Sequence, residues 1–130
     1  MTKPRLLTID DDSGFRVFMR QATEECGFDA LTVATAHEFK AAVERGRYDG
    51  LVLDLSMPDT DGIELLRYLA DIRVRAPILI VSGFDERIRE AALRLGEAHG
   101  LIMAGVLEKP VRAAEFKAKL LQLVAARPGP

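Results

Sequence analysis

Short apolar runs alternate along the chain with longer segments whose apolar residues recur every three or four positions. A continuous short apolar run is typical of a buried strand, and the three- or four-residue spacing is typical of one face of a helix. The runs predict five strands, at residues 5–9, 30–34, 50–55, 77–82 and 102–108. A segment with helical spacing follows each run, so the sequence predicts five consecutive strand–helix units.

The predicted helices have start and stop signals as well as apolar faces. Thr35 and Glu38 match a capping box, in which both side chains satisfy free backbone groups, and Gly46 is expected to end that helix. Asp12 or Ser13 is expected to cap the first helix. The expected apolar faces carry Phe15, Phe18, Met19 and Ala22; Phe39, Ala42 and Val43; Leu65, Leu66, Leu69 and Ile72; Ile88, Ala92 and Leu95; and Phe116, Leu120, Leu123 and Val124.

Strands that alternate with helices predict a parallel sheet, because each helix must cross over before the next strand begins. The strands are nearly continuous apolar runs, as expected of strands covered by helices on both faces. The predicted fold is therefore α/β, a three-layer (βα)5 open parallel sheet. A length of 130 residues suits one domain, which we assign to residues 1–126, with residues 127–130 as a tail or the start of a linker.

Charge and composition narrow the classes of function. Eighteen basic and 20 acidic residues give a net charge of -2, so no basic field exists to hold nucleic acid or an anionic membrane directly. No apolar run approaches the roughly 20 residues needed to span a bilayer. Cys26 is the only cysteine, which suits a reducing compartment. We therefore expect a soluble cytoplasmic protein.

Polar residues follow four of the five predicted strands. These residues are Asp10, Asp11 and Asp12 after the first strand, Asp54 in the third, Ser82 in the fourth, and Lys109 after the fifth. In an open parallel sheet, ligands bind beyond the carboxyl ends of the strands. With the usual strand order, these four strands surround one crevice and the second strand lies outside it.

The chemistry of this crevice points to a cation and a phosphoryl group. Two carboxylates about 4 Å apart repel by ~4 kcal/mol at an effective dielectric constant of about 20, so a cluster of three needs a partner or a raised pKa. Mg²⁺ is a suitable partner because it prefers carboxylate and carbonyl oxygens. Lys109 adds a second positive charge, and together the two cations could neutralise phosphoryl oxygens.

These residues resemble the receiver domain of two-component response regulators, a flavodoxin-like fold, over residues 5–126. The resemblance is carried by Asp10-Asp11 with Arg16, the stretch DLSMPDTDG at 54–62, Ser82-Gly83 and Lys109-Pro110. It implies that Asp54 accepts a phosphoryl group from a sensor histidine kinase or a phosphotransfer protein. Apart from its own phosphorylation and dephosphorylation, such a domain is not an enzyme.

The resemblance also implies roles for the surrounding residues. Asp11 would ligate Mg²⁺ directly and Asp10 mainly through water, with Asp54 and the backbone carbonyl of Ser56 completing the protein ligands. Ser82 and Lys109 would each bind a phosphoryl oxygen, and the Lys109–Pro110 peptide bond would be cis. The output would come from a domain beyond Pro130 or a separate effector, and the face between the fourth and fifth helices could mediate a homodimer.

Three departures from the family pattern stand out. Val106 occupies a position where many receivers have an aromatic residue, and Ser82 one where threonine is commoner. The stretch from Ser82 to Lys109 is a few residues longer than usual, a variant that resembles receivers joined to EAL-type cyclic-di-GMP phosphodiesterases. Phe84, two residues after Ser82, is expected to slow autodephosphorylation by restricting water.

Two alternative interpretations remain open at this point. A haloacid-dehalogenase-like phosphohydrolase would use Asp10 as its nucleophile within an Asp10-x-Asp12 motif, although the expected threonine after Asp12 is absent. A degenerate receiver that never accepts a phosphoryl group would serve as a docking module. The residue that becomes phosphorylated distinguishes these alternatives: Asp54 in a receiver, Asp10 in a hydrolase, and neither in a docking module.

Overall fold

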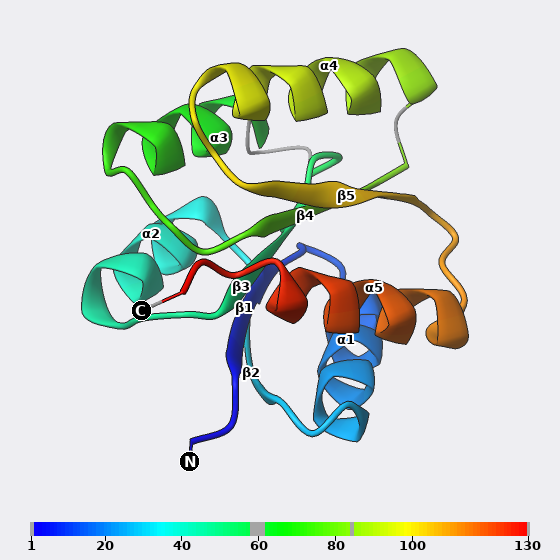
Figure 1. Cartoon of the computed structure of the whole chain (residues 1–130). Coiled ribbons are helices and arrows are strands. Elements are labelled where there is room, and N and C mark those ends of the chain that lie inside the picture. The colour runs from blue at the N-terminus through cyan, green and yellow to red at the C-terminus, as the bar shows by residue number, and fades with distance from the viewer. Residues whose placement is uncertain (1, 58–61, 84, 130) are drawn as a thin grey trace.

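The computed structural model describes residues 2–57, 62–83 and 85–129, and it confirms the predicted alternation of strands and helices (Figure 1). Most strands begin or end within a residue or so of the predicted limits. The elements in chain order are β1 (Arg5–Ile9), α1 (Ser13–Glu25), β2 (Asp29–Val33), α2 (Ala36–Arg45), β3 (Gly50–Asp54), α3 (Gly62–Asp71), β4 (Ile78–Ser82), α4 (Glu86–Ala98), β5 (Met103–Glu108) and α5 (Ala113–Ala125).

The five strands form one parallel sheet in the order β2-β1-β3-β4-β5. Helices α1 and α5 cover one face, and α2, α3 and α4 cover the other, so the predicted three layers are confirmed (Figure 1). Side chains alternate between the faces along each strand. In β1, for example, Leu6 packs toward α1 and α5, and Leu7 packs toward α2 and α3.

Burial differs between the central and the edge strands. Every residue of β3 and β4 is buried, as the apolar runs predict. The same prediction is wrong for β2 and β5, where most residues are half-buried or exposed, including Leu31 at 41% exposure. Both are edge strands with a neighbour on one side only, so part of their surface stays in contact with solvent.

The helix caps largely follow the predictions. Asp12 caps α1 by accepting a hydrogen bond from the Phe15 N–H at 3.0 Å. Thr35 accepts from the Glu38 N–H, while the Glu38 carboxylate accepts from the Thr35 hydroxyl and the Ala34 N–H. The capping box therefore forms, although Glu38 satisfies the backbone donor of Ala34 rather than that of Thr35.

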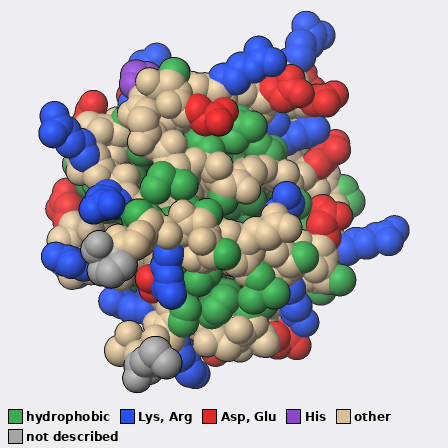
Figure 2. Space-filling view, viewed as in Figure 1, with side chains coloured by type: hydrophobic (Ala, Val, Ile, Leu, Met, Phe, Trp, Pro, Cys, Tyr) green, Lys and Arg blue, Asp and Glu red, His purple; other side chains and the backbone are tan. Residues whose placement is uncertain are grey.

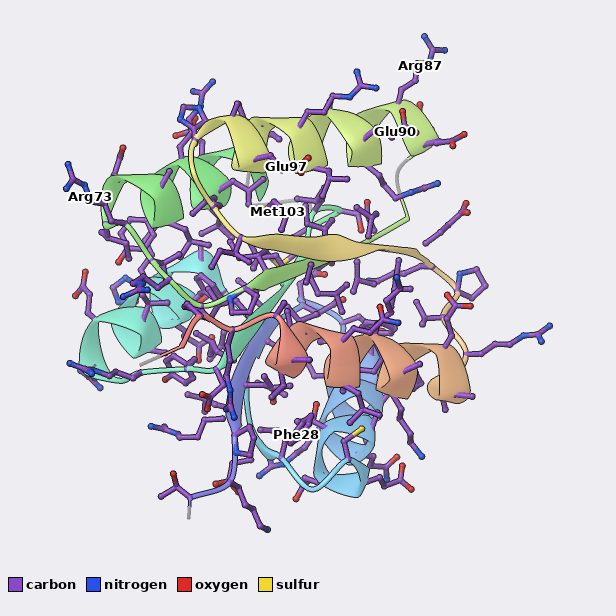
Figure 3. The ribbon with its side chains drawn as sticks, in the orientation of Figure 1. Phe28, Arg73, Arg87, Glu90, Glu97 and Met103 are labelled. Carbon is purple, nitrogen blue, oxygen red and sulfur yellow. The ribbon has the colours of Figure 1, made fainter. Side chains whose placement is uncertain are left out.

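The buried face of α4 differs from the one expected. Ile88 is 43% exposed, whereas Ala92 and Gly96 are buried. Gly96 lies against Met103, which projects from β5 beneath the helix, and a Cβ at position 96 would collide with the Met103 side chain (Figure 3). The helix therefore approaches the sheet through these small residues rather than through Ile88, and Arg87 projects away from the sheet (Figure 3).

Strand β5 contains an irregularity before it reaches the carboxyl edge of the sheet. Ile78 pairs with Met103 but Leu79 pairs with Gly105, which leaves Ala104 as an extra residue. Gly105 has a φ of +139°, a backbone conformation that favours glycine. The regular register then resumes, so that Glu108 pairs with Ser82 and Lys109 follows at the edge.

The surface contains no large region of one charge on the face visible in Figure 2, where acidic and basic side chains are interspersed. This agrees with the small net charge of the sequence. Within the described part of the chain, no helix has the length and apolar character needed to cross a membrane.

Candidate functional site

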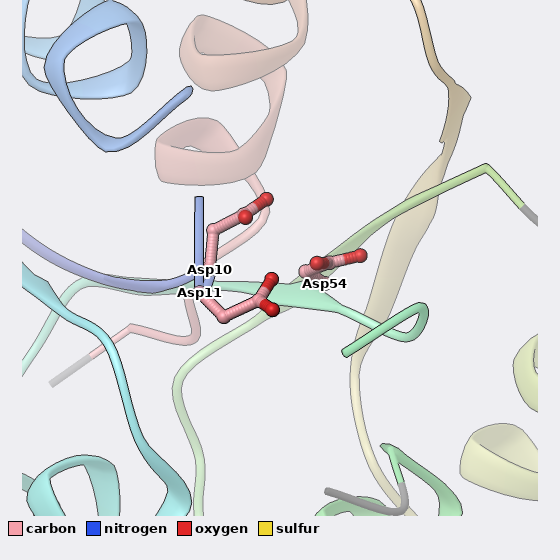
Figure 4. A group of neighbouring side chains, drawn as sticks. All are labelled: Asp10, Asp11 and Asp54. Atoms are coloured by element: carbon pink, nitrogen blue, oxygen red, sulfur yellow. The ribbon is translucent and has the colours of Figure 1, made fainter. Parts of the chain in front are cut away.

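Three carboxylates meet at the carboxyl edge of the sheet. Asp10 and Asp11 follow β1, and Asp54 ends β3, the strand next to it. One oxygen from each of the three carboxylates lies within 4.8 Å of the others, and the three side chains face the same space (Figure 4). The strand order thus brings together residues separated by more than forty positions, as the polar strand ends predicted.

Burial divides these three carboxylates. Asp10 is 0% exposed and Asp54 is 3% exposed, whereas Asp11 is exposed to solvent. Burial raises the pKa of Asp10; hydrogen bonds from Lys109 and from the Asp12 N–H oppose that rise, and the charge of Asp54 adds to it. The ionised form of Asp10 is therefore less favourable in the folded protein than it is for a carboxyl group in water.

Lys109 supplies positive charge to the two buried carboxylates. Its Nζ lies 2.6 Å from Asp10 Oδ2 and 3.4 Å from Asp54 Oδ2. Burial lowers the pKa of Lys109, but the hydrogen bond to Asp10 and the charge of Asp54 outweigh that effect and raise it. The Lys109–Pro110 peptide bond is cis, as the family resemblance implied.

Asp54 is also held by its neighbour in the following loop. The backbone N–H and the hydroxyl of Ser56 both donate to Asp54 Oδ1, at 2.9 and 2.6 Å. One oxygen of Asp54 is thus bound by Ser56 while the other faces Lys109. The sequence analysis assigned Ser56 a role only through its backbone carbonyl and missed this hydroxyl. A serine two residues after an aspartate can donate to its carboxylate, and that spacing could have indicated the contact.

Neighbouring residues fix the loop that follows β1. The Arg16 guanidinium donates to the Asp10 backbone carbonyl at 3.0 Å, and Asp10 Oδ1 accepts from the Asp12 N–H at 2.9 Å. Asp12 is committed to capping α1 and does not join the acidic cluster. Of the two caps predicted, Asp12 and Ser13, the structure thus has Asp12.

The remaining predicted residues also lie at this edge of the sheet. Ser82 is fully buried at the end of β4, and its carbonyl accepts from the Lys109 N–H at 3.0 Å. Val106, at the position where an aromatic residue is common in the family, is half-buried in β5. Residues 58–61 of the DLSMPDTDG stretch and Phe84 lie outside the described residues, so the expectation for Phe84 stays a prediction.

The donor set suits a hard divalent cation. Asp10, Asp11 and Asp54 offer only carboxylate oxygens, which are the ligands that Mg²⁺ prefers over imidazole or thiolate. Because Asp11 is exposed, the site has an open side where water or a phosphoryl group could complete the coordination. The residues present therefore fit Mg²⁺.

The chain is similar to known proteins in sequence. The family model for the response regulator receiver domain matches residues 6–121, and the chain belongs to this family. The transcriptional regulatory protein PrrA of Mycobacterium tuberculosis is 28% identical over 130 residues, covering 98% of this chain and 52% of PrrA. The transcriptional regulatory protein FixJ of Bradyrhizobium diazoefficiens is 31% identical, covering 97% of this chain and 67% of FixJ.

Solved structures agree with this assignment. The receiver domain of the Francisella response regulator 1452 superimposes with a TM-score of 0.82 at 28% identity, covering 94% of this chain and 97% of that one. The chemotaxis response regulator CheY4 of Vibrio cholerae gives a TM-score of 0.74 at 25% identity, covering 95% and 99%. The protein is thus a regulatory domain of a two-component system, and it spans about half the length of PrrA.

Proposed function

We propose that the chain accepts a phosphoryl group on Asp54 from the phosphohistidine of a sensor histidine kinase or a phosphotransfer protein, in a reaction that requires Mg²⁺. The observation that carries this proposal is the position of Asp54. It is a buried carboxylate that lies beside the acidic pair Asp10 and Asp11, with Lys109 Nζ at 3.4 Å. Mg²⁺ held by the acidic pair and the Lys109 ammonium would together neutralise the charge of the phosphoryl oxygens, which is what phosphoryl transfer needs.

In the proposed reaction an oxygen of Asp54 attacks the phosphorus atom of phosphohistidine. A new P–O bond forms, the P–N bond breaks, and the imidazole leaves with the bonding electron pair. Asp54 needs no general base, because it reacts as a carboxylate that already carries the charge. Lys109 and the Ser82 hydroxyl would each bind a phosphoryl oxygen, so Lys109 has to exchange part of its contact with Asp10 for one with the new group.

The proposed magnesium ligands are Asp11, Asp54, the Ser56 backbone carbonyl and, mainly through water, Asp10. Mg²⁺ would supply the positive charge that offsets the carboxylates and the incoming phosphoryl oxygens. Asp11 suits direct ligation, because it is exposed and makes no hydrogen bond or ion pair with any other residue in the described ranges. The indirect role of Asp10 is supported by its Oδ2, which is already bound to Lys109 at 2.6 Å.

The two alternatives have less support. In a haloacid-dehalogenase-like hydrolase Asp10 would be the nucleophile, but the family model that matches residues 6–121 is that of the receiver domain. Asp12, the second acid of that motif, caps α1. A docking module without phosphorylation would not need a buried carboxylate cluster, which is costly to maintain.

We also propose an output and a dimer surface for the domain, on the basis of its family. PrrA and FixJ are named as transcriptional regulatory proteins, which supports an output domain beyond Pro130; a separate effector, or an EAL-type phosphodiesterase domain, is the alternative. The face between α4 and α5 is the proposed surface for a homodimer. The domain would catalyse only its own phosphorylation and dephosphorylation. The cytoplasmic location and the domain limits at residues 126 and 127 stay predictions.

Intact-protein mass spectrometry with a small phosphodonor tests the proposed function. The native protein should gain one phosphoryl group with Mg²⁺ and none with a chelator. Asp54→Asn should abolish the gain, whereas Asp12→Asn, which alters only a helix cap, should retain it. A gain that persists in Asp54→Asn, or no gain in the native protein, would overturn the proposal.

A further inference from the structure

The Lys109 ammonium has a third neighbour besides the two carboxylates. Its Nζ lies 4.3 Å from the centroid of the Phe15 ring, on the first turn of α1. The face of an aromatic ring carries partial negative charge, and a cation within about 6 Å of the centroid is attracted to it. Sequence reasoning assigned Phe15 only to the apolar face of this helix.

Further aromatic side chains hold the Phe15 ring in place. It stacks on Phe18, with centroids 5.3 Å apart and planes at 27°. Phe18 in turn contacts Phe116 of α5 at 5.4 Å and 43°. Phe116 is fully buried, so the row of rings is anchored in the core between α1 and α5. The surface offered to Lys109 is therefore part of the fixed packing of the domain.

Unlike the two carboxylates, the Phe15 ring has only Lys109 to interact with among the charged groups of the proposed reaction. Asp10 and Asp54 are the partners of Lys109 in this structure, but in the proposed function Asp54 takes the phosphoryl group and Lys109 gives up part of its contact with Asp10. The Phe15 ring is not a ligand for Mg²⁺ and accepts no phosphoryl group. Its attraction for the ammonium persists when the carboxylates become engaged.

We propose that Phe15 is a positioning residue for phosphoryl uptake, which holds the Lys109 ammonium beside Asp54 while Asp10 and Asp54 engage the metal and the phosphoryl group. The proposal rests on the proposed function of Asp54. It assigns Phe15 no contact with the reacting atoms; Phe15 acts through Lys109. Without the ring, Lys109 would lose a partner that fixes its position, and phosphoryl uptake would slow.

Graded fluorination of the ring separates this electrostatic role from packing. Incorporation of phenylalanine with one, two or three fluorines at position 15 withdraws electron density from the ring face with little change in shape. The rate of phosphoryl uptake from a small donor at saturating Mg²⁺ should fall with each fluorine, by about two- to tenfold over the series. The same series at Phe18 is the matched control, because Phe18 belongs to the same row of rings and should leave the rate unchanged.

A flat series at Phe15, or an equal fall at both positions, would overturn the role of Phe15. A double-mutant cycle gives an independent check: Phe15→Leu should slow uptake with Lys109 present and have no further effect in a Lys109→Met background. An equal effect in both backgrounds would contradict the proposal. A native protein that takes up no phosphoryl group would overturn the proposed function and this role together, whereas uptake with a flat series overturns this role alone.

Discussion

Thr8 lies in β1 and is fully buried. It is the one residue among those described with a buried side-chain polar atom that has no hydrogen-bond partner. It shares its face of the sheet with Leu6, which packs in the apolar layer beneath α1 and α5. Its neighbour in β3 is Val52, another member of that layer. Because the Thr8 hydroxyl is buried without a hydrogen-bond partner among the described residues, Thr8→Val should stabilise the protein.

The expected gain follows from the cost of the unpaired hydroxyl. Leaving a buried polar group without a partner costs about 1–3 kcal/mol, and valine fills nearly the same space without that group. We expect the free energy of unfolding to rise by about 1–2 kcal/mol. With an unfolding entropy of about 2.1 cal/mol/K per residue, a chain of 130 residues gains about 4 °C in Tm for each kcal/mol, or roughly 4–8 °C in all.

Urea unfolding followed by circular dichroism, in the absence of Mg²⁺, measures this change, with an unaltered m-value as the sign that only stability has changed. Thr23→Val is the matched control: Thr23 is equally buried, but its hydroxyl donates to the Met19 carbonyl at 2.7 Å. That substitution should lower stability by about 0.5–1.5 kcal/mol. Equal or lower stability for Thr8→Val would show that a buried water satisfies the hydroxyl, and the reasoning would be refuted.

Three further predictions concern the acidic cluster and the core. Asp11→Asn should leave metal-free stability within about 0.5 kcal/mol but weaken Mg²⁺ binding about tenfold or more, measured by calorimetric titration; unchanged affinity would exclude Asp11 as a ligand. Because the folded-state pKa of Asp10 is raised above 3.8, its contribution to stability is present at low pH and is lost as pH rises through the folded-state value. Metal-free Asp10→Asn should therefore lose less stability than the native protein as the pH rises above the ordinary value of 3.8, and parallel pH profiles in urea unfolding would contradict this. Gly50→Ala would place a Cβ 2.8 Å from the Leu123 side chain and should cost about 1–3 kcal/mol in thermal or urea unfolding, whereas Gly83→Ala, with open space at its Cβ, should cost less.

The fold was largely predictable because the apolar runs contrast sharply with the helical segments between them. The strands at 5–9, 50–55 and 77–82 were predicted as buried, and they form the centre of the sheet. The burial predicted for β2 was wrong, because an apolar run does not reveal whether its strand lies at an edge. The exposure of Ile88 was not predictable either. A helix with several apolar residues can turn more than one side toward the sheet, and the sequence does not show which side it is.

Part of the site was predictable, because the carboxyl ends of parallel strands lie at the same edge of a sheet. That rule brought Asp10, Asp54 and Lys109 together before any side chain was placed. It could not predict which oxygen of Asp54 faces Lys109, or that Phe15 lies against the ammonium. Those contacts depend on rotamers and on how closely α1 approaches the sheet, which the spacing of residues in the sequence does not encode.

The extra residue in β5 also has a practical consequence for engineering the protein. The pairing of β4 with β5 accommodates Ala104 and resumes its register at Gly105, so one extra residue near the start of β5 leaves Lys109 next to the end of β4. His99 and Gly100, in the turn after α4, are both exposed. A peptide tag or a fluorescent label inserted between them should leave the phosphoryl-binding residues in place, and the turn thus offers a site for following the domain and its partners in living cells.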